Sequence, residues 1–139
     1  MDSQIWGPHA WFFLHTISFQ YPDNPTDNDK NQHASFFNSL STVLPCGVCC
    51  DHFKKFIKQY PIEKYLNNKK QLIEWVLNCH NNVNIINKKE PWSLSKLENH
   101  YNDIYTNEFY NLVSYKNGFI LVSILLFSLI LYITLCKRK

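Results

Sequence analysis

The sequence predicts an all-α protein, in which a bundle of four or five helices is followed by a C-terminal transmembrane helix. Strand signals are scarce, and the apolar residues recur at intervals of three and four, as in amphipathic helices. No residue from 118 to 136 is charged, and basic residues follow at 137–139. At about 1.5 Å per residue, this segment just crosses a hydrocarbon core of about 30 Å. We therefore expect a domain over 1–108, a linker over 109–117, a transmembrane helix over 118–136 and a basic tail over 137–139.

Five helices are expected before the linker, at 8–19, 30–43, 46–59, 69–87 and 95–105. Pro8, after Gly7, is taken as the start of the first helix, because proline is favoured at the first helical position. Apolar residues that share one side of a helix predict its inward face. These residues are Trp11, Leu14, His15 and Ser18 in the first helix, Phe36, Phe37, Leu40 and Val43 in the second, and Leu72, Trp75, Val76, Cys79 and Val83 in the fourth.

Charge and cysteine content limit the classes of function. The net charge of +3 is small, and Lys137, Arg138 and Lys139 account for it. No basic stripe runs through the rest of the chain, so the sequence does not predict nucleic acid as a partner. The five cysteines are odd in number and are not spaced as in a disulfide scaffold. The N-terminus carries no apolar run, so we expect no secretory signal.

Cys46 and Cys49 form a C-x-x-C pair between Pro45 and an amphipathic run, which places them in the first turn of a helix. Unpaired backbone N–H groups and the positive end of the helix dipole favour a thiolate there. Such a pair can close a disulfide across one turn and open it again. The same spacing also suits half of a zinc site, and spacing alone does not separate the two interpretations.

The fourth helix carries a second group of polar residues. His80 and Asn84 are four residues apart and share a face, and Asn81 adjoins them. Asparagine side chains offer a donor and an acceptor, which suits the mixed edge of a flavin or purine ring. Asparagine is frequent throughout the chain, however, so for these residues taken alone an exposed and functionally neutral cluster is the simpler interpretation.

Four ordered blocks give the chain a resemblance to a known family. They are residues 6–16 (WGPHAWFFLHT), 21–23 (YPD), 44–53 (LPCGVCCDHF) and 80–84 (HNNVN) with Lys89 beyond. In order and separation they resemble the Erv/ALR family of FAD-linked sulfhydryl oxidases, and the compact form is similar to the members of large cytoplasmic DNA viruses.

The resemblance implies a four-helix bundle with a short fifth helix, a homodimer and a noncovalently bound FAD. It assigns Cys46 and Cys49 as the redox-active disulfide that takes electrons from a protein dithiol. FAD would then pass them to molecular oxygen, which leaves as hydrogen peroxide. The implied cofactor-binding residues are Gly7, Trp11, His15, Tyr21, His80, Asn81, Val83, Asn84, Lys88 and Lys89.

Departures from the family pattern also matter. Members often have arginine where this chain has Pro8, and many carry a further structural disulfide, which we expect to be absent here. Cys79 is taken as a small buried apolar residue. Cys50 lies about 100° around the helix from Cys49 and is taken as an inert thiol. No second C-x-x-C is present to act as a shuttle, so the substrate is expected to be another protein, for example a small thioredoxin-like carrier.

Location and competing functions remain open at this point. A late single span predicts a C-terminal membrane anchor in a virion or host membrane, with the catalytic domain facing the cytoplasm, although the basic tail favours the opposite orientation. One alternative is a membrane adaptor that binds zinc through Cys46, Cys49, Cys79 and His80. Another is a structural membrane protein without flavin. The preferred interpretation, the flavin oxidase, needs no metal.

Overall fold

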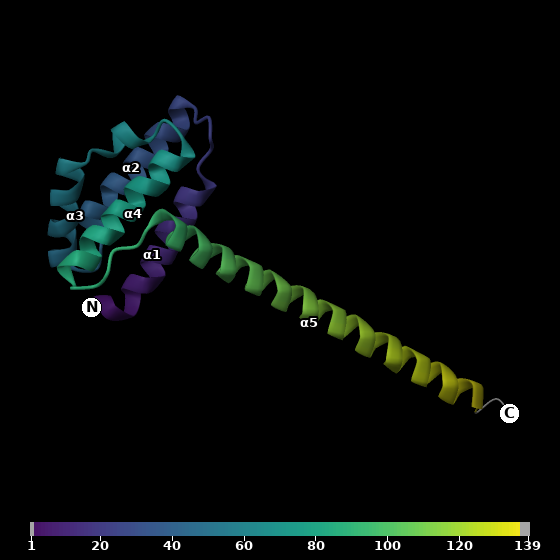
Figure 1. Ribbon diagram of the computed structural model, residues 1–139. Coiled ribbons are helices and arrows are strands. Elements are labelled where there is room, and N and C mark those ends of the chain that lie inside the picture. The colour runs from purple at the N-terminus through teal and green to yellow at the C-terminus, as the bar shows by residue number, and fades with distance from the viewer. Residues whose placement is uncertain (1, 137–139) are drawn as a thin grey trace. The chain divides into compact units, whose positions relative to one another are not determined.

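The computed structural model describes residues 2–136, without the side chains of 108–111, 117, 121, 125 and 128–136 in its last helix. The chain divides into two compact units, Met1–Leu94 and Ser95–Lys139. The first unit contains helices α1 (Ser3–Gln20), α2 (Asp27–Val43), α3 (Gly47–Gln59) and α4 (Lys69–Ile86), with a short 3-10 helix η1 (Ile62–Tyr65) before α4. The four α-helices run alternately in opposite directions (Figure 1). The predicted helical bundle is therefore confirmed for this unit.

Helix α1 begins earlier than Pro8, where the sequence placed its start. Asp2 is the N-cap, and its carboxylate accepts a hydrogen bond from the Gln4 N–H at 2.8 Å. Aspartate is a strong N-cap residue, so the helix gains a satisfied donor by starting there. Pro8 lies inside the helix and leaves one backbone bond unmade.

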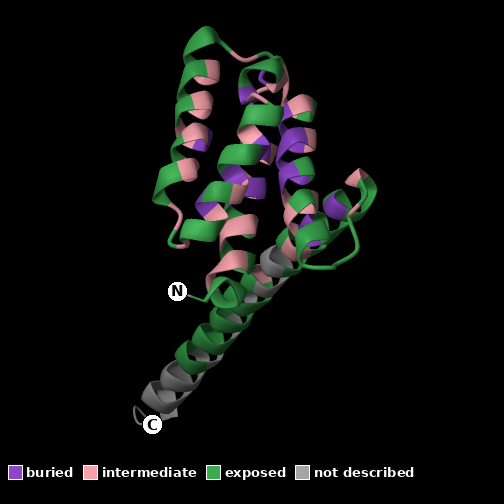
Figure 2. Ribbon diagram, turned by 90° about the vertical axis from the view of Figure 1, so that its left-hand side faces the viewer, coloured by how far each residue is buried: buried purple, intermediate pink, exposed green. Residues whose placement is uncertain are grey.

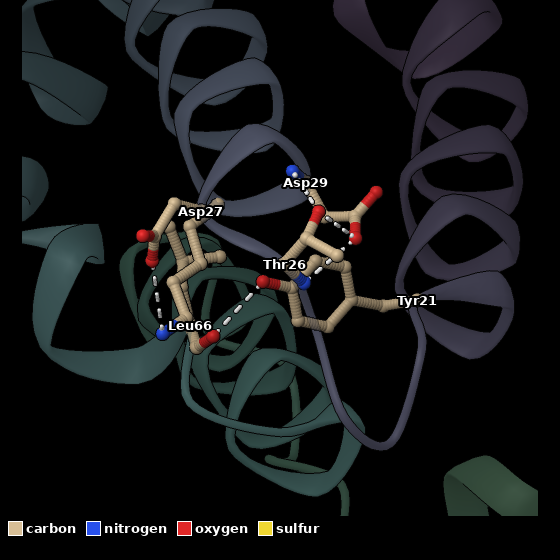
Figure 3. A network of polar contacts seen from close by, with 6 residues as sticks. Tyr21, Thr26, Asp27, Asp29 and Leu66 are labelled. Atoms are coloured by element: carbon tan, nitrogen blue, oxygen red, sulfur yellow. Dashed lines mark hydrogen bonds and ion pairs between the residues drawn. The ribbon is translucent and has the colours of Figure 1, made fainter.

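Helix α2 begins at Asp27 rather than at the predicted residue 30, because a capping box starts at Thr26. The Thr26 hydroxyl accepts from the Asp29 N–H at 3.2 Å, and the Asp29 carboxylate accepts from the Thr26 N–H at 2.8 Å (Figure 3). Nearby, the Tyr21 hydroxyl donates to the Leu66 carbonyl at 2.9 Å (Figure 3). This bond ties the end of α1 to the segment before α4.

The buried residues lie toward the middle of the bundle (Figure 2), and several of them are aromatic. Trp75 of α4 has ring centroids 5.4 Å from Phe37, 6.3 Å from Phe53 and 5.4 Å from Phe56. Its indole N–H donates to the Tyr60 carbonyl at 2.8 Å. The predicted inward faces of α1 and α4 are confirmed, but Val43 is 64% exposed, because it lies in the last turn of α2.

Helix α4 ends in a Schellman motif. The Lys88 N–H donates to the Ile85 carbonyl at 3.0 Å, and the Lys89 N–H donates to the Asn84 carbonyl at 2.8 Å. This motif needs a left-handed residue just past the helix, and glycine usually provides it. Here the residue is Lys88, with φ 57°.

The described part of the second unit belongs to helix α5 (Leu94–Cys136). The predicted short helix at 95–105 and the predicted linker at 109–117 are parts of this one helix. No proline or glycine occurs between Leu94 and Gly118, so nothing in that stretch stops the helix. The first compact unit ends at Leu94, and the domain division expected from the sequence, with a boundary at 108, stays a prediction.

The predicted transmembrane helix at 118–136 requires correction. In the described part of the chain, no helix combines the length and apolar character needed to cross a bilayer. A span takes about 20 consecutive apolar residues. The described side chains after Gly118 reach only to Phe127, and polar residues precede them, among them Lys116. The predicted basic tail at 137–139 lies outside the described residues, and the predicted membrane location stays untested.

Candidate active site: a disulfide at a helix start and an aromatic cluster beside it

Cys46 and Cys49 form a disulfide across the first turn of α3, with their Cα atoms 5.1 Å apart. Cys46 is the N-cap residue, and its Sγ accepts a hydrogen bond from the Cys49 N–H at 3.2 Å. Of the two interpretations that the C-x-x-C spacing left open, the structure shows the disulfide. A zinc site would require both sulfurs as thiolates, and the disulfide excludes that in this state.

The segment before the disulfide is held by the Leu44 carbonyl. This oxygen accepts from the Cys46 N–H at 2.8 Å and from the Cys50 Sγ at 3.4 Å. Cys50 is a buried free thiol outside the disulfide. Its contact supports the turn at Pro45, which fixes where α3 begins.

Trp11, His15 and His80 form a second group, called here the aromatic cluster. The Trp11 and His80 rings are stacked, with centroids 4.3 Å apart and planes 10° from parallel. His15 Nε2 and His80 Nδ1 lie 3.0 Å apart, so one ring donates to the other. Because α1 packs on α4, residues 65 positions apart in sequence meet here.

His80 is electrically neutral at physiological pH. Burial and the charge of Lys89 lower its pKa from 6.5 to about 4. A neutral imidazole keeps one nitrogen as an acceptor, which suits the bond shared with His15 and a flat polar ligand.

The disulfide and His80 lie at the same end of the bundle. Helices α3 and α4 run in opposite directions and are joined through the contacts of Trp75 with Phe53 and Phe56 (Figure 1). Cys49 lies four residues before Phe53, and Cys79 lies four residues after Trp75. Each interval is about 6 Å along the helix axis, so both turns reach the same level.

The other predicted site residues, except Tyr21, lie on α1 and α4 or just after the end of α4. Gly7, Val83, Asn81 and the buried Asn84 lie on α1 and α4, and Lys88 and Lys89 are exposed at the end of α4. Tyr21 is different. It is fully buried in the core, with its hydroxyl on Leu66 and its ring 4.6 Å from that of His33. Its pKa is raised by burial and by the nearby Asp29 carboxylate, so it remains a neutral phenol.

Cys79 is 3% exposed and lies in the core cluster, as predicted for a small apolar residue. Burial raises the pKa of its thiol strongly, which keeps it protonated. A buried, protonated thiol is poorly suited to thiol exchange, which requires a thiolate.

Trp92 is the site residue that sequence reasoning missed. Its ring centroid lies 5.8 Å from that of His80, and its backbone is bonded to the Asn81 amide. The signal was a tryptophan next to Pro91 in an otherwise polar segment, where no core position was expected.

The residues gathered here fit a flat heteroaromatic cofactor that carries phosphate. Three stacked or tilted rings offer a platform, neighbouring amides offer hydrogen bonds, and two lysines stand at the helix end. The indole nitrogen of Trp6, beside Gly7, is buried and has no hydrogen-bond partner among the described residues. A buried donor of this kind calls for a ligand or a water.

Comparison with known proteins identifies relatives of this arrangement. A family model described as the Erv1/Alr family matches residues 8–102. A protein of Acanthamoeba polyphaga mimivirus, named as a probable FAD-linked sulfhydryl oxidase, is 36% identical over 91 residues, which cover 65% of this chain and 64% of the relative. The mitochondrial FAD-linked sulfhydryl oxidase ERV1 of Saccharomyces cerevisiae is 28% identical over 102 residues, which cover 73% of this chain and 53% of the relative.

A solved structure gives the same result for the fold. The crystal structure of the FAD binding domain of Erv1 from Saccharomyces cerevisiae superposes with a TM-score of 0.69 at 29% identity. The match covers 74% of this chain and 96% of that domain. The chain therefore corresponds to nearly all of that domain, but it spans less than two thirds of the full-length relatives described above.

Proposed function

The chain belongs to the Erv1/Alr family, and from this premise we propose that it is an FAD-dependent sulfhydryl oxidase that forms disulfide bonds in protein thiols. The observation that carries the proposal is the Cys46–Cys49 disulfide at the start of α3. It lies at the same end of the bundle as the aromatic cluster, so a redox pair and a platform for a flat cofactor occur together.

The residues present fit FAD as the cofactor. Trp11, His15 and His80 would hold the rings, and Lys89, with Lys88 beside it, would face the phosphates. When bound, FAD supplies a two-electron acceptor for the dithiol, which the side chains of this protein cannot provide. The neutral state of His80 avoids placing a second cation next to Lys89.

Thiol exchange at the disulfide follows from its place on the helix. A substrate thiolate attacks the Cys46 Sγ, the Cys46–Cys49 bond breaks, and Cys49 leaves as a thiolate. The second substrate thiol then displaces Cys46, so that the substrate is oxidised and both cysteines are reduced. The Cys49 N–H, which already points at the Cys46 Sγ at 3.2 Å, stabilises negative charge on that sulfur.

The overall reaction would convert two thiols and molecular oxygen into one disulfide and hydrogen peroxide. Cys46 and Cys49 form the one C-x-x-C in these 139 residues, which supports direct exchange with a protein dithiol, such as that of a small thioredoxin-like carrier. A homodimer is also proposed. Ile5, Phe12 and Phe13 of α1 are exposed by 72%, 39% and 57%, and they form an apolar surface that a second copy could cover.

One preparation tests the proposal. The purified chain should absorb near about 450 nm from bound flavin and should release peroxide when given a reduced protein dithiol. Cys46→Ser and Cys49→Ser should keep the flavin and lose at least about 100-fold in turnover, because the exchange step requires both sulfurs. A Cys50→Ser variant is the matched control. A folded but colourless protein that does not take up added FAD would contradict the proposal.

A further inference from the structure

Asn81 was assigned to the cofactor by resemblance, but its side chain is engaged elsewhere. Its amide nitrogen donates to the Trp92 carbonyl at 2.8 Å, and its amide oxygen accepts from the Trp92 N–H at 2.7 Å. Both bonds are well within the usual length for N–H···O contacts. The amide thus holds the backbone of a single residue, eleven positions further along the chain.

These two hydrogen bonds join the segment that follows α4 to the helix itself. The chain leaves the helix through the left-handed Lys88 and returns to the helix at Trp92. Asn81 and His80 are neighbours on α4, so fixing the Trp92 backbone also brings its indole to His80, at a centroid distance of 5.8 Å. Lys89, Glu90 and Pro91, which lie between the helix end and Trp92, are exposed, so the two bonds from Asn81 join an exposed segment to α4.

We propose that Asn81 is a positioning residue, which clamps residues 87–93 so that the Trp92 indole walls the His80 side of the aromatic cluster. Trp92, rather than the Asn81 amide, then contacts the bound ring system and excludes water from it. The inference rests on the proposed function, since it takes the aromatic cluster as the FAD site. It adds Trp92 as a binding residue and moves Asn81 to a supporting role.

The burial of His80 agrees with a site that Trp92 closes to water on this side. Its pKa is lowered by burial and by Lys89, and the other titratable group that faces it is His15, at 3.0 Å. If the clamp is opened, water reaches the His80 ring and the burial contribution falls. The pKa of His80 should then rise toward its ordinary value of 6.5.

The first experiment uses the full chain without FAD, so it does not depend on the proposed function. The His80 ring is titrated by NMR in the wild type, in Asn81→Ala and in Asn82→Ala, a matched control at the neighbouring exposed position. The pKa should rise by about one unit in Asn81→Ala and stay unchanged in the control. An unchanged pKa in Asn81→Ala would overturn the clamp. If that variant does not fold, Asn81→Leu replaces it, because leucine is similar in size, removes both hydrogen bonds and adds no charge next to His80.

The second experiment separates positioning from direct contact by a double-mutant cycle on FAD affinity. Asn81→Ala and Trp92→Ala should each weaken binding about tenfold, and the double variant should be no weaker than either single one. Full affinity in Trp92→Ala would show that the Trp92 ring does not contribute to binding. Additive losses in the double variant would show that Asn81 acts on the cofactor independently of Trp92. Either result would overturn the inference. A wild-type chain that binds no FAD would refute the proposed function, while the His80 titration would still decide the clamp.

Discussion

The two ends of the candidate site are built in opposite ways. At the start of α3, the disulfide, its cap and its turn all lie within Leu44–Cys50, so short-range bonds define the geometry. At the end of α4, His80 depends on Trp11, 69 positions away, and Asn81 depends on Trp92. The geometry of the disulfide end therefore depends on contacts close in sequence, and that of the aromatic cluster depends on tertiary contacts. Damage to the packing should separate the two functions.

Trp75 gives the largest expected effect, because it joins the two ends. Trp75→Ala removes contacts with Phe37, Phe53 and Phe56 and a bond to Tyr60, and it should cost about 3–5 kcal/mol of unfolding free energy. Trp75→Phe keeps part of the packing and should cost less. Urea unfolding followed by circular dichroism measures both. A loss below about 1 kcal/mol in the alanine variant would show that the ends are not linked through this ring.

Acid should lower the unfolding free energy through His80 in the aromatic cluster. The pKa of His80 is about 4 in the folded chain against 6.5 ordinarily, so between these values the unfolded chain binds more protons. Stability is then lost as the pH falls from 6.5 to 4, with a slope of at most about 1.4 kcal/mol per unit. Unfolding free energies across this range should show the slope in the wild type and in a control, His9→Gln, but less of it in His80→Phe. An equal slope in all three proteins would assign the effect to other groups.

A substitution of Lys88, just after the end of α4, should increase the stability of the fold. Lys88 has φ 57°, a conformation that costs an L-residue about 1 kcal/mol relative to glycine. Lys88→Gly should therefore raise the unfolding free energy by about that amount, which is visible in the melting temperature. Lys88→Ala is the control, because it removes the charge and keeps the strain. If both variants changed stability equally, the charge rather than the backbone would be the cause.

Cys50 gives the smallest expected effect. Its thiol is buried and bonded to the Leu44 carbonyl, and a serine hydroxyl can make the same bond. Cys50→Ser should keep turnover within about twofold of the wild type, since the Cys46–Cys49 pair is unaltered. A severe loss in a peroxide assay would instead assign the third sulfur a part in exchange.

The sequence predicted the local features well and the distant ones less well. Periodicity located α4 within one residue, and the C-x-x-C pair was correctly placed in the first turn of α3, although its spacing alone left a disulfide and a zinc site open. The start of α2 was missed because Thr26 and Asp29, which cap it, were taken as loop residues. Composition also suggested that the apolar 118–136 segment forms a separate span, whereas the structure continues α5 into it without a break.

The predicted site residues show the same division. His80 and Trp11 share no sequence neighbourhood, and only a family resemblance or a structure could bring them together. The role of Tyr21 could not be read from its motif, because its partner Leu66 lies 45 positions away. The engagement of Asn81 with Trp92 depends on the path of the loop between them, which periodicity does not describe.

The cap on α3 bears on how the protein behaves between oxidation states. The Cys46 sulfur that accepts the Cys49 N–H belongs to the disulfide, and the same atom remains an acceptor when it is reduced. The helix thus keeps this capping hydrogen bond whether the Cys46–Cys49 disulfide is closed or open. Opening and closing of the disulfide can then proceed with little backbone reorganisation, and amide exchange at Cys49 should stay equally slow in both states.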